Sequence, residues 1–257
     1  MRGLNHFEQQ TTPSRFRTAT LLFVESPAPT AAATYRLLHH FDLDELVYTH
    51  TSARIPGTDC YLINQYGLLF NEVTASNLVK IDMANTTSQP QIANTAGITI
   101  HGAVYQARPD VQCIIHTHTP AGVAVSADRH GLLPISQSAM IAGTSLAYHD
   151  YQGIAIDHAE RVSLQNDLGD KRCMILRNHG LLAVGNSVGQ AFLTMHNLES
   201  ACRIQVLVNK NTMLMPESGV LEKFPSTLHA FREQNEWTLA WSALLRLADK
   251  LYPDYKE

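Results

Sequence analysis

The sequence predicts an α/β sandwich built on a central, mostly antiparallel sheet. Short β-rich runs separated by turn sequences fill much of the first half of the chain, and helical stretches flank them. The strands and helices do not alternate regularly, as the βαβ units of a dinucleotide-binding fold would. With 257 residues, of which 45% are hydrophobic, the chain can bury a substantial core.

The amino-acid composition argues against some classes of binding partner. The formal net charge is -4, so no broad basic surface favours nucleic acid or an anionic membrane. No apolar run is long enough to span a bilayer, and the N-terminus lacks the apolar core and cleavage site of a signal peptide. We therefore expect a cytoplasmic protein with a small-molecule or protein partner, and four cysteines that remain reduced.

The N-terminal part of the chain divides into a tail and the start of a domain. Residues 1–28 are polar and interrupted by prolines, which predicts a flexible extension, and residues 29–257 are predicted to form one domain. Residues 30–41 have helical composition and spacing. Three β-rich runs follow, joined by turn or loop sequences at PGTD and NEVTASN: residues 47–55, 60–70 and 78–83.

The next predicted helix covers residues 97–109, and residues 111–118 are predicted to form a strand. Thr119 can cap a helix, and Pro120 suits the first helical position, where its missing N–H costs nothing. The helix at residues 121–129 should therefore begin as soon as this strand ends.

The second half of the chain is predicted to be richer in helix. Two strand-like runs, residues 174–180 and 181–185, come before the most regular helix, residues 186–208. Two further helical stretches follow near the C-terminus, the second at residues 238–252.

Two histidines stand at the end of the strand in CIIHTHTPAG. His116 and His118 are two residues apart, so along a strand both side chains point to the same face. His179, in RNHG, also ends an apolar run and is the candidate third ligand. Three neutral imidazoles suit zinc and leave one position open for water or substrate. Because the chain has 13 histidines, spacing alone leaves a chance pairing equally open.

At these residues the chain resembles the class II aldolase/adducin family, most closely its adducin-like bacterial branch. The resemblance covers about residues 34–257 and rests on several motifs in order: YTHTSARIPG, YLINQYGLLFNEVTASNLVKID, RPDVQCIIHTHTPAGVAVS, LAYHDYQG, MILRNHGLLAVG and HNLESACRIQV. It implies a three-layer α/β/α fold and a homotetramer. It also implies a zinc site, or one for Mn²⁺, Fe²⁺, Co²⁺ or Ni²⁺, formed by His116, His118 and His179.

The sequence departs from the family pattern at the acid/base position and in the phosphate-binding motifs. In the sugar-phosphate aldolases a carboxylate precedes the first metal histidine by 19 residues, and here that position is Gly97. The phosphate motif keeps Ser52 and Arg54 but has His50 where the family has asparagine, and its Thr-Gly pair keeps only Gly67. Ser52, Arg54 and Gly67 remain candidate anion- or substrate-binding residues. These departures argue against a sugar-phosphate aldolase.

Other side chains could move the proton that the missing carboxylate would have moved. His101 lies one helical turn after Gly97, and Tyr148 and His149 are further candidates. Two more tyrosines, Tyr252 and Tyr255, would qualify if the C-terminal tail reached a neighbouring subunit's site. For each of these side chains a packing or surface role is an equally good interpretation.

Two functions remain open from the sequence. The first is a metal-dependent carbon–carbon lyase or decarboxylase that acts on a small oxo- or hydroxy-acid through a metal-stabilised enediolate, without nucleic-acid or membrane partners. A decarboxylation needs an electron sink more than a base. The second is a non-catalytic adducin-type assembly module, with actin- or cytoskeleton-like binding by resemblance and a vestigial or structural metal site.

Overall fold

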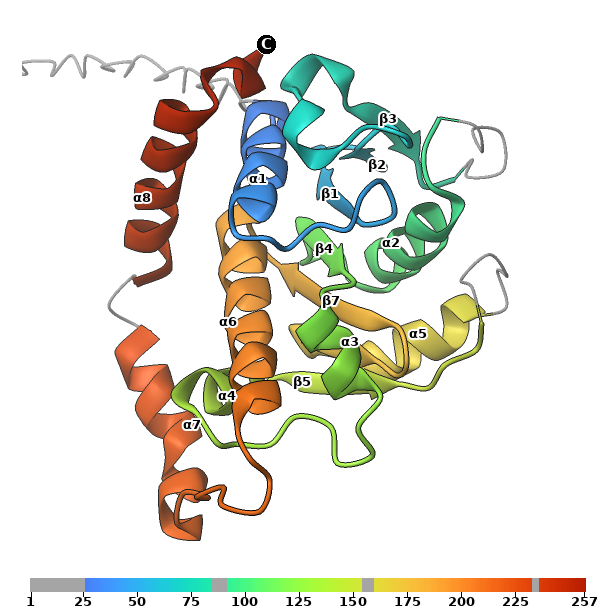
Figure 1. The fold of residues 1–257 in the computed structure, drawn as a ribbon. Coiled ribbons are helices and arrows are strands. Elements are labelled where there is room, and N and C mark those ends of the chain that lie inside the picture. Colours follow the sequence, from blue (N-terminus) through green and yellow to red (C-terminus); the bar gives the residue numbers. More distant parts are fainter. Residues whose placement is uncertain (1–25, 85–91, 154–159, 233–235) are drawn as a thin grey trace, which may run out of the picture.

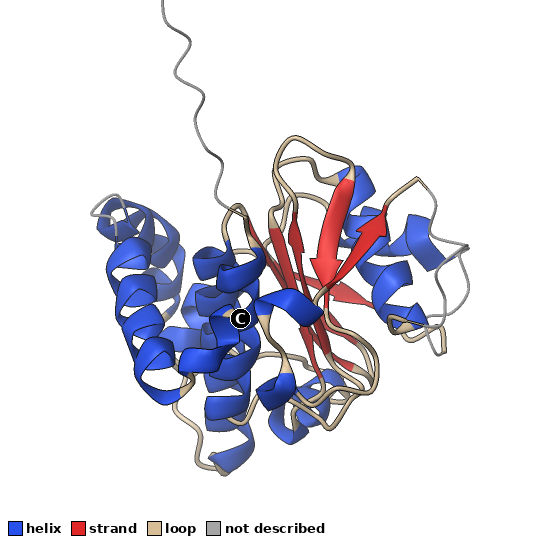
Figure 2. Cartoon of the chain, turned by 90° about the horizontal axis from the view of Figure 1, so that it is seen from above, coloured by secondary structure: helices blue, strands red, loops and turns tan. Residues whose placement is uncertain are grey.

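A computed structural model describes residues 26–84, 92–153, 160–232 and 236–257. One sheet of seven strands lies between two layers of helices (Figures 1 and 2). This architecture confirms the predicted three-layer α/β/α sandwich. Most of the predicted N-terminal extension, residues 1–25, lies outside the described part of the chain.

The sheet has the strand order β3-β2-β1-β4-β7-β6-β5. Neighbouring strands are antiparallel except for β5 and β6, which are parallel, so the sheet is mostly antiparallel as predicted. The strand bounds are β1 His50–Arg54, β2 Cys60–Ile63, β3 Val79–Asp82, β4 Cys113–Thr117, β5 Leu146–His149, β6 Cys173–Leu176 and β7 Gly180–Gly185.

Helices cover both faces of the sheet. On one face α1, α6 and α8 contribute to a core that contains Tyr35 and Phe192, and on the other face α2 and α5 pack over Ile114 and Met174. The helix bounds are α1 Ala28–His40, α2 Thr95–Ala107, α3 Pro120–Ser126, α4 Gln137–Gly143, α5 Glu160–Leu168, α6 Val188–Leu207, α7 Ser218–Arg232 and α8 Glu236–Leu251. No helix in the described ranges has the length and apolar character needed to cross a membrane.

The long run predicted as a strand at residues 60–70 is wrong beyond Ile63. The chain leaves the sheet there and turns at Gly67, whose φ is +100°. Two 3-10 helices, η1 Phe70–Glu72 and η2 Ala75–Asn77, then occupy the predicted loop. Phe70 is fully buried with its ring edge-to-face against Tyr35, so it belongs to the helical side of the core.

The start of α3 confirms the predicted junction between strand and helix. Thr119 has extended backbone angles, and its hydroxyl accepts a hydrogen bond from the Gly122 N–H, 3.2 Å away. The chain therefore passes from the central strand β4 into a helix within three residues.

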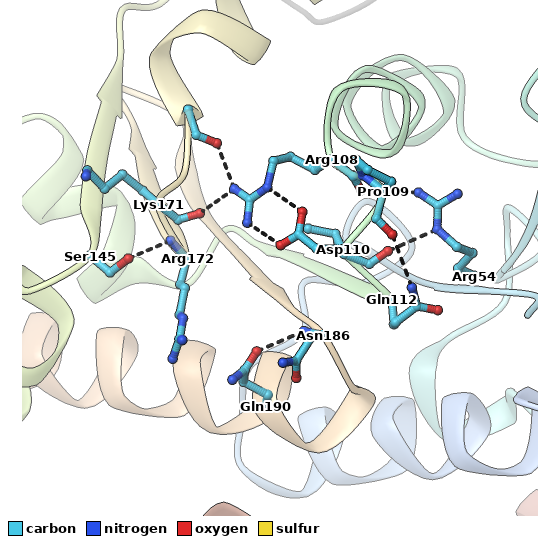
Figure 3. Close-up of polar contacts among 12 residues, drawn as sticks. Arg54, Arg108, Pro109, Asp110, Gln112, Ser145, Lys171, Arg172, Asn186 and Gln190 are labelled. Atoms are coloured by element: carbon cyan, nitrogen blue, oxygen red, sulfur yellow. Dashed lines mark hydrogen bonds and ion pairs between the residues drawn. The ribbon is translucent and has the colours of Figure 1, made fainter. Parts of the chain in front are cut away.

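The turn after α2 is held by an arginine (Figure 3). Arg108 donates to both carboxylate oxygens of Asp110, at 2.7 and 2.8 Å, and to the carbonyls of Gly169 and Lys171. The Arg108 guanidinium also lowers the pKa of Asp110. These contacts give the Arg108–Asp110 segment a structural role, as a turn.

Candidate metal centre

Three histidines converge where β4 meets the turn before β7. His116 lies on β4, His118 just after it, and His179 in the turn between β6 and β7. Their Nε2 atoms lie 2.7 Å (His116–His118), 3.0 Å (His118–His179) and 3.3 Å (His116–His179) apart. In the described part of the chain this is the group of ligand-type side chains that could hold a metal ion.

The backbone before β7 brings His179 to the pair. Antiparallel pairing sets Thr117 of β4 opposite Leu181 of β7, so the turn before β7 lies beside the end of β4. Asn178 has a φ of +55°, which tightens this turn. A Cβ at Gly180 would overlap the carbonyl oxygen of Thr117, so only glycine allows the two segments to approach this closely.

In two of the three rings, a hydrogen bond at Nδ1 determines which ring nitrogen carries the proton. His116 Nδ1 lies 2.9 Å from the carbonyl oxygen of Leu181, and His118 Nδ1 lies 2.9 Å from Oε2 of Glu45. Each Nδ1–H therefore donates outward, which leaves the Nε2 lone pair directed at the other histidines. A carboxylate or carbonyl behind a histidine is the usual outer partner of a metal ligand.

Burial keeps His116 and His179 neutral near pH 7. Desolvation, followed by the neighbouring histidines, lowers the pKa of His116 well below its usual value, and the same causes bring the pKa of His179 to about 4. Neutral nitrogens with inward lone pairs repel one another at this spacing unless a cation lies between them. Zinc bound tetrahedrally at about 2.0–2.1 Å from each nitrogen would separate the nitrogens by about 3.3 Å. His116 and His179 already have this separation, and the two shorter pairs, at 2.7 and 3.0 Å, would open by a few tenths of an ångström to hold such an ion.

The three histidines line one side of a cleft of about 390 Å³. Its volume falls within the range of small-molecule sites. The other described residues that line it are Glu45, Tyr48, His50, Tyr66, Asn94, Ala96, Tyr151 and Gly153.

The structure does not bring Ser52 and Arg54 into this cleft. Ser52 is buried on β1, where its hydroxyl contacts His101 and Tyr105. Arg54 lies at the far end of β1, beside the turn that contains Arg108 (Figure 3). It donates to the carbonyls of Val111 and Tyr105, at 3.0 and 2.9 Å. Both side chains are therefore committed to protein partners.

Gly67 lies next to the cleft-lining Tyr66, with open space where a Cβ would be. An anion-binding role for Gly67 stays a prediction.

The proposed acid/base residues have separate environments. His101 is fully buried, and its Nε2 lies 2.9 Å from Nδ1 of His50, so it lies directly behind the cleft. Tyr148 accepts a hydrogen bond from the Leu132 N–H and lies under the Arg177 guanidinium.

His149 is held between Asp167, at 2.7 Å, and Glu160, at 3.3 Å. Of the two C-terminal tyrosines, Tyr255 donates to Asp249, and Tyr252 contacts Arg36 and His40. In this chain none of these three side chains lines the cleft.

Sequence reasoning missed two residues that complete the site. The sequence indicates His50 only as the loss of an asparagine, but its position opposite His116 in the β1–β4 register sets it beside the three histidines. The alternation of His50 and Ser52 on β1 was the available signal. Glu45 lies in the loop between α1 and β1, where no sequence pattern indicated a role.

The fold and site together define a class of protein: an α/β/α sandwich with three histidines, at the end of its central strands, that could hold a divalent metal. The family described as Class II Aldolase and Adducin N-terminal domain matches residues 30–206. The chain belongs to this family, which confirms the resemblance found in its motifs.

Relatives from bacteria and animals share the match. A protein of Pseudomonas aeruginosa, assigned by name to the class 2 aldolases, is 42% identical over 234 residues, which are 88% of this chain and 90% of that protein. Alpha-adducin of Mus musculus is 50% identical over 181 residues, which are 68% of this chain and 24% of the adducin. The similarity to adducin therefore covers only about a quarter of that longer protein.

Solved structures show the same fold. An aldolase II superfamily protein from Pseudomonas syringae has a TM-score of 0.84 at 43% identity, covering 90% of this chain and 94% of that one. L-fuculose 1-phosphate aldolase from Glaciozyma antarctica has a TM-score of 0.75 at 25% identity, covering 90% of this chain and 91% of the aldolase.

Proposed function

We propose that this protein binds a divalent metal, zinc or one of Mn²⁺, Fe²⁺, Co²⁺ and Ni²⁺, through His116, His118 and His179. We further propose that it acts as a carbon–carbon lyase or decarboxylase on a small oxo- or hydroxy-acid. The observation that carries the proposal is the convergence of three Nε2 atoms within 3.3 Å, two of them with the opposite ring nitrogen already engaged.

The chain's own residues would orient the ligands and the substrate. Glu45 and the Leu181 carbonyl hold the rings of His118 and His116 at fixed angles, so little reorganisation is needed to bind an ion. When bound, a divalent metal supplies a Lewis acid that stabilises negative charge developing on a substrate oxygen. Two tyrosine hydroxyls among the lining residues, from Tyr48 and Tyr66, offer further hydrogen bonds.

Two features support a small acid over a sugar phosphate. The described lining of the cleft includes no lysine or arginine, and it includes the carboxylate of Glu45, so a phosphate dianion would find no side-chain cation there. Gly97 offers no side chain that could move a proton, which suits a reaction driven mainly by an electron sink. Small oxo- and hydroxy-acids also carry two oxygens on adjacent carbons, which suits chelation of a hard cation.

Metal analysis of protein purified without an affinity tag tests the proposal. We expect about one equivalent of metal per chain, lost in His116→Ala while the circular dichroism spectrum is unchanged. His130→Ala is the matched control, because the His130 side chain is 68% exposed and lies outside the cleft. Less than a few tenths of an equivalent in the wild type, even after reconstitution with each metal, would contradict the site.

The second candidate function is a non-catalytic assembly module of adducin type, in which any metal is structural or vestigial. The 50% identity to alpha-adducin, higher than that to the bacterial relative, favours it. A screen of aldol and decarboxylation substrates with metal-loaded protein, beside co-sedimentation with actin filaments, separates the two. Turnover that disappears in His116→Ala supports the enzyme, and filament binding without turnover supports the module.

We also propose that the protein forms a homotetramer in the cytoplasm. The support is the exposure of large apolar side chains along the last helices, with Leu207 84% and Leu239 72% exposed in the single chain. Monomeric proteins rarely expose large apolar patches.

A further inference from the structure

Four buried polar side chains form a continuous line behind the three histidines. Tyr105 Oη lies 3.0 Å from Ser52 Oγ, which lies 2.5 Å from His101 Nδ1. His101 Nε2 then lies 2.9 Å from His50 Nδ1. All four residues are at most 2% exposed, so no bulk water competes for these contacts.

The number of protons and acceptors among these four side chains determines which of them donates at each contact. The Tyr105 hydroxyl has Ser52 Oγ as its partner in the described part of the chain, so its proton is bonded only if Tyr105 donates to Ser52. Ser52 must then donate to His101 Nδ1, and His101 must carry its proton on Nε2 and donate to His50 Nδ1. The opposite direction would leave the phenol proton buried without an acceptor, which costs about 1–3 kcal/mol.

This direction determines the chemistry of His50. Because its Nδ1 accepts from His101, the neutral ring must carry its proton on Nε2. Burial lowers the pKa of His101 to about 3, so this ring is neutral near pH 7 and can donate from one nitrogen only.

The Nε2 atom of His50 faces the cleft. His50 lines the cleft, and its Nδ1 contacts His101 on the side away from the cleft. Its Nε2 is not one of the fully buried nitrogens that lack a hydrogen-bond partner. The His50 and His116 ring centroids are 4.9 Å apart, so this N–H lies beside the proposed metal ligands.

Gly97 makes the space for this ring. A Cβ at position 97 would lie 3.0 Å from both Cγ and Cδ2 of His50, and 3.2 Å from Cδ1 of Ile63. The absence of a side chain at Gly97 therefore leaves the space that the His50 ring occupies. A side chain at position 97 would require the His50 ring to shift by a few tenths of an ångström.

We propose that His50 is a substrate-binding residue of the metal cleft, a fixed Nε2–H donor for a negatively charged oxygen of a bound carboxylate or related oxyanion. The residues of the line, His101, Ser52 and Tyr105, are positioning residues that keep this proton on Nε2. The inference rests on the proposed function, since it assigns the ligand class of the same cleft. A protonated Nε2 makes His50 neither a fourth metal ligand nor a base.

Nitrogen-15 NMR of histidine-labelled protein tests the tautomer directly. We expect His50, assigned with His50→Asn, to show a protonated Nε2 and an unprotonated Nδ1 in the wild type. His101→Phe removes the hydrogen-bond donor to Nδ1 of His50, and we expect a mixture of both tautomers of His50. His101→Gln keeps an amide that can donate to Nδ1, and we expect it to restore the wild-type pattern. A wild-type His50 with its proton on Nδ1 would overturn the proposal whatever the metal content.

Calorimetric titration with oxalate tests the binding role. Metal content is measured first, so that failure of the metal site is recognised separately. We expect His50→Ala to keep the wild-type metal content and to bind oxalate about tenfold to a hundredfold more weakly, as for loss of a hydrogen bond to a charged group. We expect His50→Asn, which retains an N–H donor, to lose less.

Other results of the titration overturn the assignment in different ways. Unchanged oxalate binding in His50→Ala would show that the donor does not contact the ligand. Loss of metal in His50→Ala would make His50 a metal ligand. A wild-type protein that binds no metal would remove the proposed function and this inference with it, while the NMR result would still report the tautomer.

Discussion

The second nitrogen of each histidine ring decides what the first can do in this protein. His116 and His118 donate through Nδ1 to an oxygen, so their Nε2 atoms are free as ligands. His50 accepts through Nδ1 from another histidine, so its Nε2 is a donor. Neighbouring rings in one cleft thereby acquire opposite roles from their partners behind the cleft.

Acid should destabilise the metal-free protein through these buried rings. The pKa of His101 is about 3 in the folded chain, against about 6.5 when exposed in the unfolded chain. Between these values the unfolded state binds the additional proton, so the free energy of unfolding falls as pH decreases from about 6.5 towards 3.

Urea denaturation of metal-free protein at several pH values measures this effect. We expect a smaller pH slope in His101→Gln, which removes one of the contributing groups. His130→Ala, which removes an exposed imidazole, should keep the wild-type slope. Equal slopes in the wild type and His101→Gln would show that His101 titrates normally.

The arrangement of the three histidines depends on how closely β7 approaches the end of β4. Gly180→Ala would push a methyl group into the Thr117 carbonyl and to 3.0 Å from Cδ2 of His118. We expect a loss of about 1–3 kcal/mol in the free energy of unfolding, as for overpacking, together with weaker metal binding. Thermal denaturation and metal titration measure the two effects.

Gly143→Ala is the matched control for this prediction. Gly143 ends α4, and nothing lies within 4 Å of where its Cβ would be. We expect unchanged metal binding and stability that is equal or slightly higher, because alanine favours a helix more than glycine does. A Gly180→Ala variant that behaves like this control would show that β7 can move without disturbing the histidines.

The elements that the sequence predicted well are those with a strong local signal. Helices α1, α2, α6 and α8 differ from their predicted ranges by one or two residues at each end. Strand β5 and helices α4 and α5 were not predicted, because four to nine residues are too few for a periodic pattern to stand out.

The site was only partly predictable for a related reason. The spacing of His116 and His118 sets both on one face of a strand, and this needs only local geometry. His50 and Glu45 reach the same cleft through strand register and loop conformation, which the sequence does not show directly. The direction of donation along the line from Tyr105 to His50 depends on three tertiary contacts, which no local sequence pattern indicates.

The last helices present apolar side chains outward. Leu207, Leu214 and Leu239 are 84%, 87% and 72% exposed, and they lie on or between α6, α7 and α8. The same region covers one face of the sandwich in Figure 1, on the side away from α2 and α5. Burial of such side chains between subunits would stabilise an assembly by about 1.5–3 kcal/mol for each fully buried leucine.

We predict that this surface holds the proposed homotetramer together. Light scattering after size-exclusion chromatography should give the mass of four chains of 28.5 kDa for the wild type. Leu239→Lys combined with Leu207→Lys should reduce that mass, because an unpaired charge in an apolar interface costs several kcal/mol. Val162→Lys, on the exposed surface of α5 in the opposite layer, should leave the mass unchanged. If Val162→Lys dissociates the assembly and the leucine variant does not, the subunits meet through the other layer.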